Sequence, residues 1–398
     1  MGVVMKFGGT SLKNTNLITQ IAKSILNKKE EQIVIVVSAM GKNTDYLISL
    51  AKQLTPNLDK RELDTLLATG EQQTIALLTL ALKHHGINAI SLTGFQAGFK
   101  TTKDHTKSII VDIDTTRIKK HLNEKMIVVV AGFQGMSEDG DITTLGRGGS
   151  DTSAVALAAK LQFSCEIYTD VDGIYRVDPN IYPLAKKITQ ISYDEMMEMA
   201  KKGASIIETR SVELAKIYQV PLYIAKSLSE KGSGTYLMNK TQLFENKPIT
   251  GLSITDDVVM ITLTNTQKKL TNMSLVFNQL AKHNISIDMI SQTIDSNQNI
   301  VLSFSIENED LRDVYELIHL EPLFQTFHID VKPNLTKISL VGVGMASHFG
   351  VASKVFSTLT NEMIKYYTIS TSEISISCTI NKQDTKKAVY ALSLQFNL

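Results

Sequence analysis

Residues 144–156 read TLGRGGSDTSAVA, and this stretch is the most informative in the chain. Three glycines surround Arg147, and residues 150–152 are Ser, Asp and Thr, types that favour the start of a helix. An Ala-rich helix is predicted to follow at 154–161. An arginine on such a loop can bind a carboxylate or phosphate through two hydrogen bonds, while adjacent N–H groups form an anion-binding nest. The stretch therefore predicts an anion-binding loop that leads into a helix.

Outward from this loop, apolar runs alternate with helical patterns across residues 1–245. Two runs, QIVIVVS at 32–38 and MIVVVA at 126–131, are apolar throughout, which is typical of parallel strands buried on both faces. Other predicted elements are strands at 3–7, 89–92 and 166–170 and helices at 17–26, 74–83 and 192–200, the last with a capping-box pattern at Ser192 and Glu195. The alternation predicts a three-layer α/β/α domain with a mainly parallel sheet.

After residue 243 the pattern changes to strands and helices in the order βαββαβ, and this order occurs twice. The predicted elements are strands at 258–263, 286–290, 299–306, 337–341 and 373–380 and helices at 270–283, 311–319, 350–361 and 382–395. Two ferredoxin-like modules are therefore expected, at 254–331 and 336–398. A tandem of this kind indicates a regulatory half.

Composition narrows the classes of function. Of the 398 residues, 43% are hydrophobic and 20% charged, which excludes a disordered chain. The net charge of +1 gives no field that would attract a polyanion, so we expect no nucleic-acid partner. No apolar run approaches the roughly 20 residues that cross a bilayer, so we expect no membrane association and a cytoplasmic location. Cys165 and Cys378 lie far apart in apolar segments, which favours buried free thiols over a disulfide or a metal site.

The hexapeptide KFGGTS at 6–11 ends the first predicted strand. Its glycines let the backbone approach a charged ligand, and Lys6 supplies a cation, although the hexapeptide alone also fits an ordinary Gly-Gly turn. The chain contains no GxxxxGK[ST] phosphate loop. A ligand-binding role for Lys6 therefore depends on the loops that meet it.

Three further loops carry polar side chains. VSAMGKNTD at 37–45 and YTDVDGIY at 168–175 follow buried strands, at the sheet edge where parallel-sheet proteins bind ligands. ATGEQ at 68–72 is predicted to begin the helix that continues from Gln73. In that position Glu71 fits either a ligand-binding role or a favourable interaction with the helix dipole.

Together these loops resemble the aspartokinase family, which has the amino-acid-kinase fold. The matching motifs are KFGGTS (6–11), VSAMGKNTD (37–45), TGEQ (69–72), TGFQAG (93–98), VAGFQ (130–134), TLGRGGSDTSAVA (144–156), YTDVDGIY (168–175) and DP (178–179). The C-terminal modules are similar to ACT domains, most clearly at KISLVGVGM (337–345) and STSEISIS (370–377). The resemblance covers essentially the whole chain.

The resemblance implies an enzyme that transfers the γ-phosphoryl group of ATP to the β-carboxylate of L-aspartate, in the biosynthesis of lysine, threonine and methionine. A carboxylate with a pKa of about 3.9 is ionised at neutral pH and needs no general base, so positioning and charge neutralisation must carry the catalysis. Lys6 would lie against the transferring phosphoryl group, and Asp151 would orient Lys6. Mg²⁺ would bridge the phosphates rather than sit in a protein cage.

The family's binding residues map onto this chain as three sets. The aspartate-binding set is Ser38, Thr44, Glu71, Arg147, Gly148, Gly149 and Ser150, with Arg147 on the α-carboxylate and Glu71 on the α-amine. The nucleotide-binding set is Lys6, Phe7, Gly8, Gly9, Tyr168, Thr169, Asp170, Ile174, Tyr175, Asp178 and Pro179. The effector set is Lys268, Thr271, Met273, Ser286, Ile287, Asp288 and Gln292, which would bind lysine or threonine between ACT modules of neighbouring chains in a homo-oligomer.

Two departures from the family pattern bear on these sets. Residues 203–205 read GAS where the family usually has a nucleotide-contacting Lys in third place, so that contact is lost or is supplied by Lys226 or Arg210. The Pro-Gly turn that opens each effector pocket is replaced by KKLTN at 268–272 and by HFG at 348–350. The effector is expected to be lysine, alone or with threonine.

Three alternatives remain open. The chain could be a non-catalytic amino-acid sensor with a relic kinase half, which ATP-dependent formation of aspartyl hydroxamate would test. It could be a dehydrogenase, because GVGMAS at 342–347 partly matches a dinucleotide-binding pattern, although the third glycine is missing. It could also be a kinase of the same fold that acts on glutamate, acetylglutamate, carbamate or UMP, although those enzymes lack a tandem ACT half.

Overall fold

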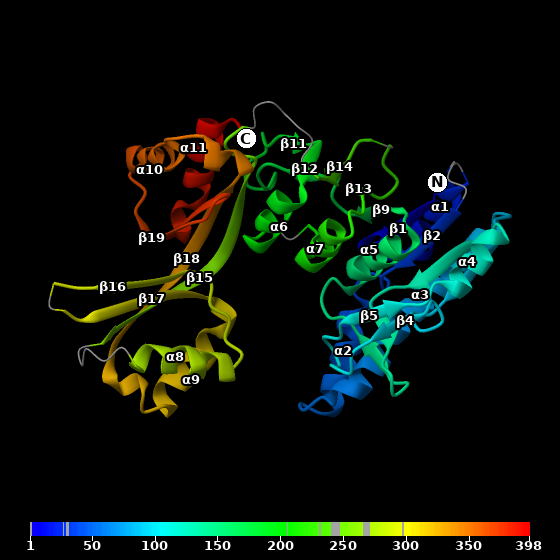
Figure 1. Ribbon diagram of the computed structural model, residues 1–398, viewed down its shortest axis with the longest axis horizontal. Helices are drawn as coiled ribbons and strands as arrows, with labels where there is room; N and C mark the ends of the chain where they lie inside the picture. Colours follow the sequence, from blue (N-terminus) through cyan, green and yellow to red (C-terminus); the bar gives the residue numbers. More distant parts are fainter. Residues whose placement is uncertain are drawn as a thin grey trace. The chain divides into compact units, whose positions relative to one another are not determined.

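The computed structural model describes residues 2–26, 28, 32–204, 206–230, 232–239, 247–265, 271–296 and 298–398, without the side chains of 271–273 and 346. The described residues divide into two compact units (Figure 1). The first unit comprises residues 1–175, 187–200 and 205–243, and the second comprises 176–186, 201–204 and 244–398.

The first unit is built on an eight-stranded sheet. In pairing order its strands are β12 (Gln190–Ser192), β14 (Thr235–Met238), β13 (Leu222–Lys226), β9 (Ser164–Thr169), β1 (Gly2–Phe7), β2 (Gln32–Val37), β6 (Ile127–Ala131) and β3 (Ala89–Leu92). All neighbouring pairs are parallel except β13 and β14. Its helices are α1 (Thr15–Ile25), α2 (Asn43–Leu54), α3 (Lys60–His84), α4 (Thr116–Asn123), α5 (Gly149–Leu161), α6 (Tyr193–Lys201) and α7 (Thr209–Ile217). The predicted mainly parallel α/β architecture is confirmed.

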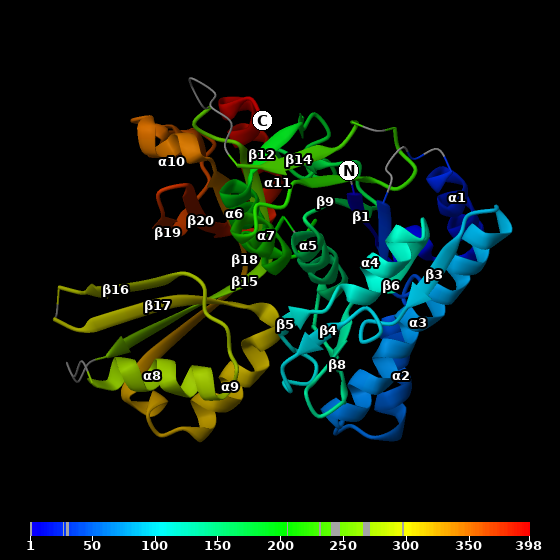
Figure 2. The ribbon, with the colours of Figure 1, turned by 45° about the vertical axis from the view of Figure 1, so that its right-hand side comes forward.

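The pleat of β1 decides which side chains face which helices. Val3, Met5 and Phe7 pack in one core with residues of α1 and α3. The alternate residues point to the opposite face, where α5 contacts β1 and β9. Val4 is fully buried on that face, and Lys6 follows it at the carboxyl end of the strand. The ribbon shows α5 and α1 on opposite sides of these strands (Figure 2).

A smaller four-stranded sheet lies in the same unit and leads into α5. Its order is β5 (Ile110–Ile113), β4 (Phe99–Thr101), β7 (Gln134–Met136) and β8 (Ile142–Thr144). A short ladder joins β10 (Ile174–Tyr175) to β11 (Lys187–Ile188). The hairpin of β7 and β8 docks on α3, since Gln134 is buried and its side chain donates to the carbonyl of Ala68 at 2.9 Å.

The second unit contains one six-stranded sheet. In pairing order its strands are β16 (Ile290–Ile294), β17 (Ile300–Glu307), β15 (Gly251–Asn265), β18 (Phe327–Val341), β20 (Ser375–Asn381) and β19 (Tyr366–Thr371). Its helices are α8 (Thr271–Lys282), α9 (Leu311–Leu320), α10 (Val351–Asn361) and α11 (Thr385–Phe396). Two separate cores form, one with α8 and α9 and the other with α10 and α11. The two cores belong to the two ferredoxin-like modules that the repeated pattern predicts.

The two modules share their central strands. The first part of β15, up to Thr255, pairs with 337–341 of β18 beside the second core, whereas the part after Val258 pairs with 327–335 beside the first core. A register irregularity between Thr255 and Val258 separates the two parts. The predicted domain bounds of 254–331 and 336–398 stay a prediction, and both pass through these shared strands.

Two local expectations are wrong. Glu71 does not begin a helix, because α3 runs unbroken through it; Gly70 lies inside the same helix, where a Cβ would be only 2.9 Å from the Cβ of Ala39. Residues 286–289 form no strand, and β16 begins only at Ile290. The dehydrogenase alternative gains no support, because the run 342–347 follows β18, which is antiparallel to both neighbours. The capping box of α6 and the two buried free thiols are confirmed.

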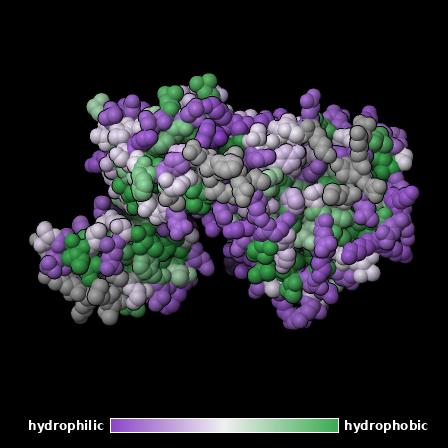
Figure 3. Space-filling view, turned by 45° about the horizontal axis from the view of Figure 1, so that its top comes forward, coloured by the Kyte–Doolittle hydropathy of each residue, from purple (hydrophilic) through white to green (hydrophobic). Residues whose placement is uncertain are grey.

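The outer surface of the units carries both hydrophilic and hydrophobic side chains. On the face drawn in Figure 3, purple hydrophilic side chains are spread across the surface with smaller green groups between them. Of the helices that the structure describes, none is both long enough and apolar enough to cross a membrane.

Candidate active site

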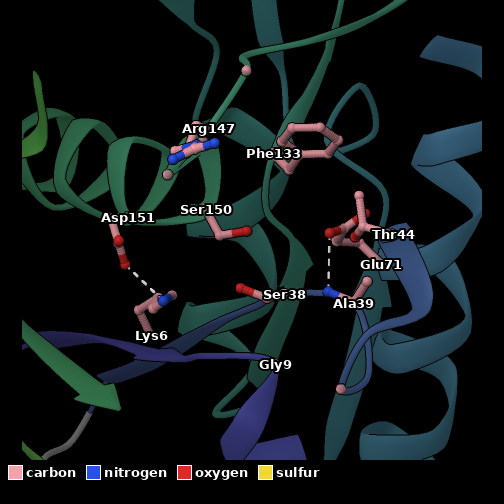
Figure 4. A pocket seen from close by; sticks show the side chains of 14 residues that line it. Lys6, Gly9, Ser38, Ala39, Thr44, Glu71, Phe133, Arg147, Ser150 and Asp151 are labelled. Carbon is pink, nitrogen blue, oxygen red and sulfur yellow. Dashed lines mark hydrogen bonds and ion pairs between the residues drawn. The ribbon is translucent and has the colours of Figure 1, made fainter. Parts of the chain in front are cut away.

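A cavity of about 240 Å³ lies at the carboxyl edge of the large sheet in the first unit. Its lining combines the segments that the sequence singled out, and consists of Lys6, Gly9, Ser38, Ala39, Gly41, Thr44, Glu71, Phe133, Gly146, Arg147, Gly148, Gly149, Ser150 and Asp151. In Figure 4, Lys6 and Asp151 lie on one side and Thr44 and Glu71 on the other, with Ser38 and Ser150 between them. The opening strand and the arginine loop therefore meet around one cavity.

Parallel pairing of β1 with β2 brings the first two loops together. Lys6 is in register with Val36, so the chain leaves both strands at the same edge. Gly9 lies so close to the second loop that a Cβ there would be 2.8 Å from the carbonyl oxygen of Ala39. Only glycine fits at this crossing, and it holds the two loops side by side under the cavity.

Lys6 and Asp151 form a buried ion pair. The two side chains are 9% and 13% exposed, and Lys6 Nζ lies 2.7 Å from Asp151 Oδ1. Asp151 stands in the first turn of α5, and Lys6 points to it because the pleat of β1 directs residue 6 to the α5 face. Gly8 leaves room for the amine, since a Cβ there would be 3.3 Å from Lys6 Nζ. The pair fixes a cation at the cavity wall.

The arginine loop uses left-handed backbone that suits glycine. Gly146 and Gly148 have φ of 78° and 63°, and a Cβ at Gly148 would lie 2.4 Å from the Cβ of Glu208. The loop ends in α5, whose first residues, Gly149 and Ser150, line the cavity. The N-terminus of α5 thus directs its positive dipole end and its N–H groups toward any anion bound there.

Glu71 is a buried carboxyl with an unused acceptor. It is 3% exposed, and its Oε1 accepts a hydrogen bond of 2.9 Å from the backbone N–H of Ala39. Within the described part of the chain its Oε2 has no hydrogen-bond partner. Burial raises the pKa of Glu71 from 4.5 to about 8. A buried oxygen of this kind beside a polar cavity is suited to a cationic group of a ligand.

The predicted aspartate-binding set lies together. Ser38, Thr44, Glu71, Arg147, Gly148, Gly149 and Ser150 all line the cavity, as do Lys6, Gly9 and Asp151. Sequence reasoning missed Phe133 as a lining residue, although it follows a buried strand in the VAGFQ motif. Phe133 has a φ of 68°, an uncommon backbone for an aromatic residue, and such residues concentrate at functional sites.

The remaining residues of the predicted nucleotide set do not line this cavity. Phe7 and Tyr168 stack at the ends of adjacent strands, with ring centroids 5.0 Å apart, and Tyr168 donates to Glu166 at 2.7 Å. Thr169 donates to Asp170 at 3.0 Å, Tyr175 donates to Asp172 at 3.1 Å, and Ile174 is fully buried. Asp178 and Pro179 belong to the second unit. The nucleotide-binding role of this set stays a prediction.

The substitutes for the missing nucleotide-contacting Lys differ in their surroundings. Ser205 itself lies outside the described residues. The guanidinium of Arg210 donates to the carbonyls of Ser108 and Leu145 at 3.3 Å, so it holds the start of the arginine loop. Lys226 is exposed at the end of β13, in register with Thr169. Whether the contact is lost or is supplied by one of these two residues stays a prediction.

Part of the predicted effector set can be located in the second unit. Lys268 and the side chains of Thr271 and Met273 lie outside the described residues. Ser286 and Ile287 precede β16, and Gln292 lies on it with an exposed side chain. Asp288 forms an ion pair with buried Lys337, and Lys202 Nζ lies 3.8 Å from its other oxygen.

Comparison with known proteins yields family matches along most of the chain. The model of the amino acid kinase family matches residues 1–226, and that of the ACT domain matches residues 338–396. Aspartokinase 2 of Bacillus subtilis is 44% identical over 400 residues, covering 100% of this chain and 98% of that protein. An aspartokinase of Helicobacter pylori is 41% identical and is covered completely.

Solved structures share the fold. Aspartokinase III of E. coli, in complex with aspartate and ADP (R-state), matches over 100% of both chains with a TM-score of 0.82 and 24% identity. Aspartate kinase from Synechocystis is 38% identical, with a TM-score of 0.56, and the match covers 100% of this chain and 69% of that one. The match to the E. coli protein, at 24% identity, shows that this chain shares its fold.

Proposed function

Because the chain belongs to the aspartokinase family, we propose that its cavity binds L-aspartate and that the enzyme transfers the γ-phosphoryl group of ATP to the β-carboxylate, giving 4-phospho-L-aspartate. The observation that carries this proposal is the shared cavity of Lys6, Glu71 and the loop 146–151. A cation, a buried acid and a helix N-terminus suit one small dicarboxylic amino acid next to a phosphate. A relic kinase half is not favoured, because full-length relatives are aspartokinases and the charged set is intact.

Opposite walls of the cavity would bind the two charged groups on the α-carbon of aspartate. Glu71 has a free buried oxygen for the α-amine, and Arg147 would bind the α-carboxylate with its fork of N–H groups. Thr44 and Ser38 would supply hydroxyl contacts, and Gly148 and Ser150 would direct N–H groups at the carboxylates. Gly149, whose N–H donates to the carbonyl of Gly146, would line the cavity wall. These contacts would leave the β-carboxylate toward Lys6.

Catalysis would then depend on charge and position. The β-carboxylate is ionised at neutral pH, so attack on the γ-phosphorus requires no proton transfer to a base. The ammonium of Lys6 would offset negative charge on the transferring phosphoryl oxygens. Asp151 would hold that ammonium in place through their 2.7 Å ion pair. As the bond between the γ-phosphorus and the bridging oxygen breaks, ADP carries away the bonding electron pair.

ATP would approach along the edge of the sheet next to this cavity. We place its phosphates near Lys6, Gly8 and Gly9 and its nucleoside near the segment 168–175, with Lys226 as a further contact. Mg²⁺ would bind the phosphates of ATP rather than a protein cage, because Mg²⁺ usually keeps several waters and binds substrate phosphates with few protein ligands. When bound, Mg²⁺ would neutralise part of the phosphate charge.

Kinetics of four variants test this assignment. Formation of aspartyl hydroxamate that depends on both ATP and aspartate should occur with wild type. Lys6→Ala and Asp151→Ala should each lower kcat by about a thousandfold or more with smaller changes in KM. Arg147→Ala should chiefly raise the KM for aspartate, by on the order of tenfold to a hundredfold.

Lys160→Ala is the matched control for the lysine variant. Lys160 lies on α5 and pairs with Asp112 at the same distance of 2.7 Å, but on the exposed surface. The Lys160→Ala variant should retain the wild-type kcat. Unchanged kcat in Lys6→Ala would remove Lys6 from the reaction, and absence of aspartate-dependent turnover in wild type would refute the proposed function.

For regulation, we propose that lysine, alone or with threonine, binds the first ACT module and shifts a two-state equilibrium of a homo-oligomer formed through the ACT modules. Asp288 and Gln292 would contact the effector. The half-exposed carboxylate of Asp288 offers a partner for an effector amine. Activity measured with each amino acid, singly and combined, tests the proposal, and indifference to both would refute feedback control.

A further inference from the structure

The loop that carries Arg147 must be fixed by its neighbours, because two of its residues are glycines in left-handed backbone. Gly146 rests on a second loop: a Cβ there would lie 3.1 Å from the carbonyl oxygen of Thr106. At the other end of the second loop, Ser108 donates its N–H to the carbonyl of Thr144 at 2.9 Å. The position of Arg147 therefore depends on the loop 104–108 beneath it.

Thr106 is itself held in an unusual conformation. Its φ is 70°, a region that β-branched residues rarely adopt. Its N–H donates to both carboxylate oxygens of Asp64, at 3.1 and 3.0 Å, and the adjacent His105 Nδ1 lies 2.9 Å from Asp64 Oδ2. Asp64 thus stabilises a backbone that would otherwise relax away from Gly146.

The same carboxylate also binds the strand that leads into the arginine loop. Thr144, the last residue of β8, donates its hydroxyl to Asp64 Oδ1. Asp64 is completely buried on α3, seven residues before Glu71, which places both side chains on the same face of that helix two turns apart. The buried carboxylate of Asp64 therefore joins the helix of Glu71 to the loop 104–108 and to strand β8, the two segments that support the loop of Arg147.

We propose that Asp64, which does not line the cavity, is a positioning residue that sets the separation of Glu71 and Arg147 and so determines the affinity for the amino-acid substrate. The inference rests on the proposed function, in which these two residues bind the α-amine and the α-carboxylate of aspartate. Figure 4 shows them on opposite sides of the pocket. Nucleotide affinity should be largely independent of Asp64, because its contacts support only the aspartate-binding side.

Isosteric substitutions separate this role from general stability. Thr144→Val replaces the hydroxyl that donates to Asp64 by a methyl group, and Asp64→Asn places an amide donor against groups that are already donors. Each should raise the KM for aspartate by about tenfold, leave the KM for ATP within about twofold, and lower kcat less than KM rises. Thr144→Ser keeps the hydroxyl and should restore the wild-type KM for aspartate.

Thr143→Val is the matched control. Thr143 lies next to Thr144 on β8, is also buried, and hydrogen-bonds Thr101 instead of Asp64. It should lower the melting temperature about as much as Thr144→Val while leaving the KM for aspartate unchanged. If Asp64→Asn fails to fold, the comparison of Val and Ser at position 144 decides the question.

The outcomes distinguish this inference from the proposed function. The positioning role is overturned if folded Thr144→Val keeps a wild-type KM for aspartate while Arg147→Ala raises it, or if Thr143→Val raises it equally. If Arg147→Ala leaves that KM unchanged, the proposed aspartate clamp is wrong and the positioning role falls with it.

Discussion

The pH dependence of aspartate binding is a sharp test of the site, because Glu71 must be ionised to bind the α-amine of aspartate as proposed. Burial raises this pKa to about 8. At pH 7 about one molecule in eleven therefore carries the carboxylate, although the α-amine of aspartate is already a cation. Binding must expel the proton, which costs about 1.4 kcal/mol at pH 7 and about twice that at pH 6.

We expect the KM for aspartate, measured by coupled ADP release at saturating ATP, to fall about tenfold between pH 6 and 7 and to level off above about pH 8. Glu71→Gln keeps the size and the acceptor for the N–H of Ala39 but cannot ionise, so its KM should be high and independent of pH. Glu195→Gln changes a buried glutamate outside the cavity and should keep the wild-type slope. The KM for ATP, measured over the same pH range, is the control for titration of the ATP phosphates.

The same pKa predicts an opposite effect on stability. Between its ordinary value of 4.5 and about 8, the folded protein holds a proton on Glu71 that the unfolded chain has released. The free energy of unfolding therefore falls as the pH rises through this window. Glu71→Gln should melt above wild type near about pH 8, and the two should melt together only below about pH 4, where the unfolded chain also holds the proton. A wild-type KM that is flat between these pH values, or an unchanged slope in Glu71→Gln, would refute the reasoning.

Two other substitutions test the arginine loop and the effector site. Gly148→Ala introduces a Cβ 2.4 Å from Glu208 at a φ of 63°, so kcat/KM should fall sharply. Gly86→Ala is the control, because Gly86 has a φ of 79° but no atom within 4 Å of the added Cβ. It should lower only the melting temperature, by an amount that reflects the backbone strain alone. Asp288→Asn should abolish the response of the activity to lysine without changing the uninhibited turnover. Asp257→Asn, which changes an exposed ion pair with Lys382, should respond to lysine like wild type. A retained lysine response in Asp288→Asn would remove Asp288 from the effector site.

Much of the fold follows from local sequence. The uninterrupted apolar runs of β2 and β6 could be identified because a strand buried on both faces needs no alternation, and they fix the mainly parallel sheet. The glycine-rich loop that leads into α5 was also predictable, since its glycines and helix-favouring residues lie in one stretch. The place of Glu71 inside α3 was not predicted, and the contact that excludes a Cβ at Gly70 joins segments remote in sequence.

The kind of loop, the kind of element and, through the motifs, the family could therefore be inferred from the residues alone. Only the tertiary structure decided that Lys6 and Asp151 meet on the α5 face, that β15 and β18 are shared between two cores, and that Asp64 joins α3 to the arginine loop. Distances between segments remote in sequence depend on the register and packing of everything between them. The raised pKa of Glu71 has the same origin, because desolvation is a property of the surroundings that fold around a side chain and not of the residue itself.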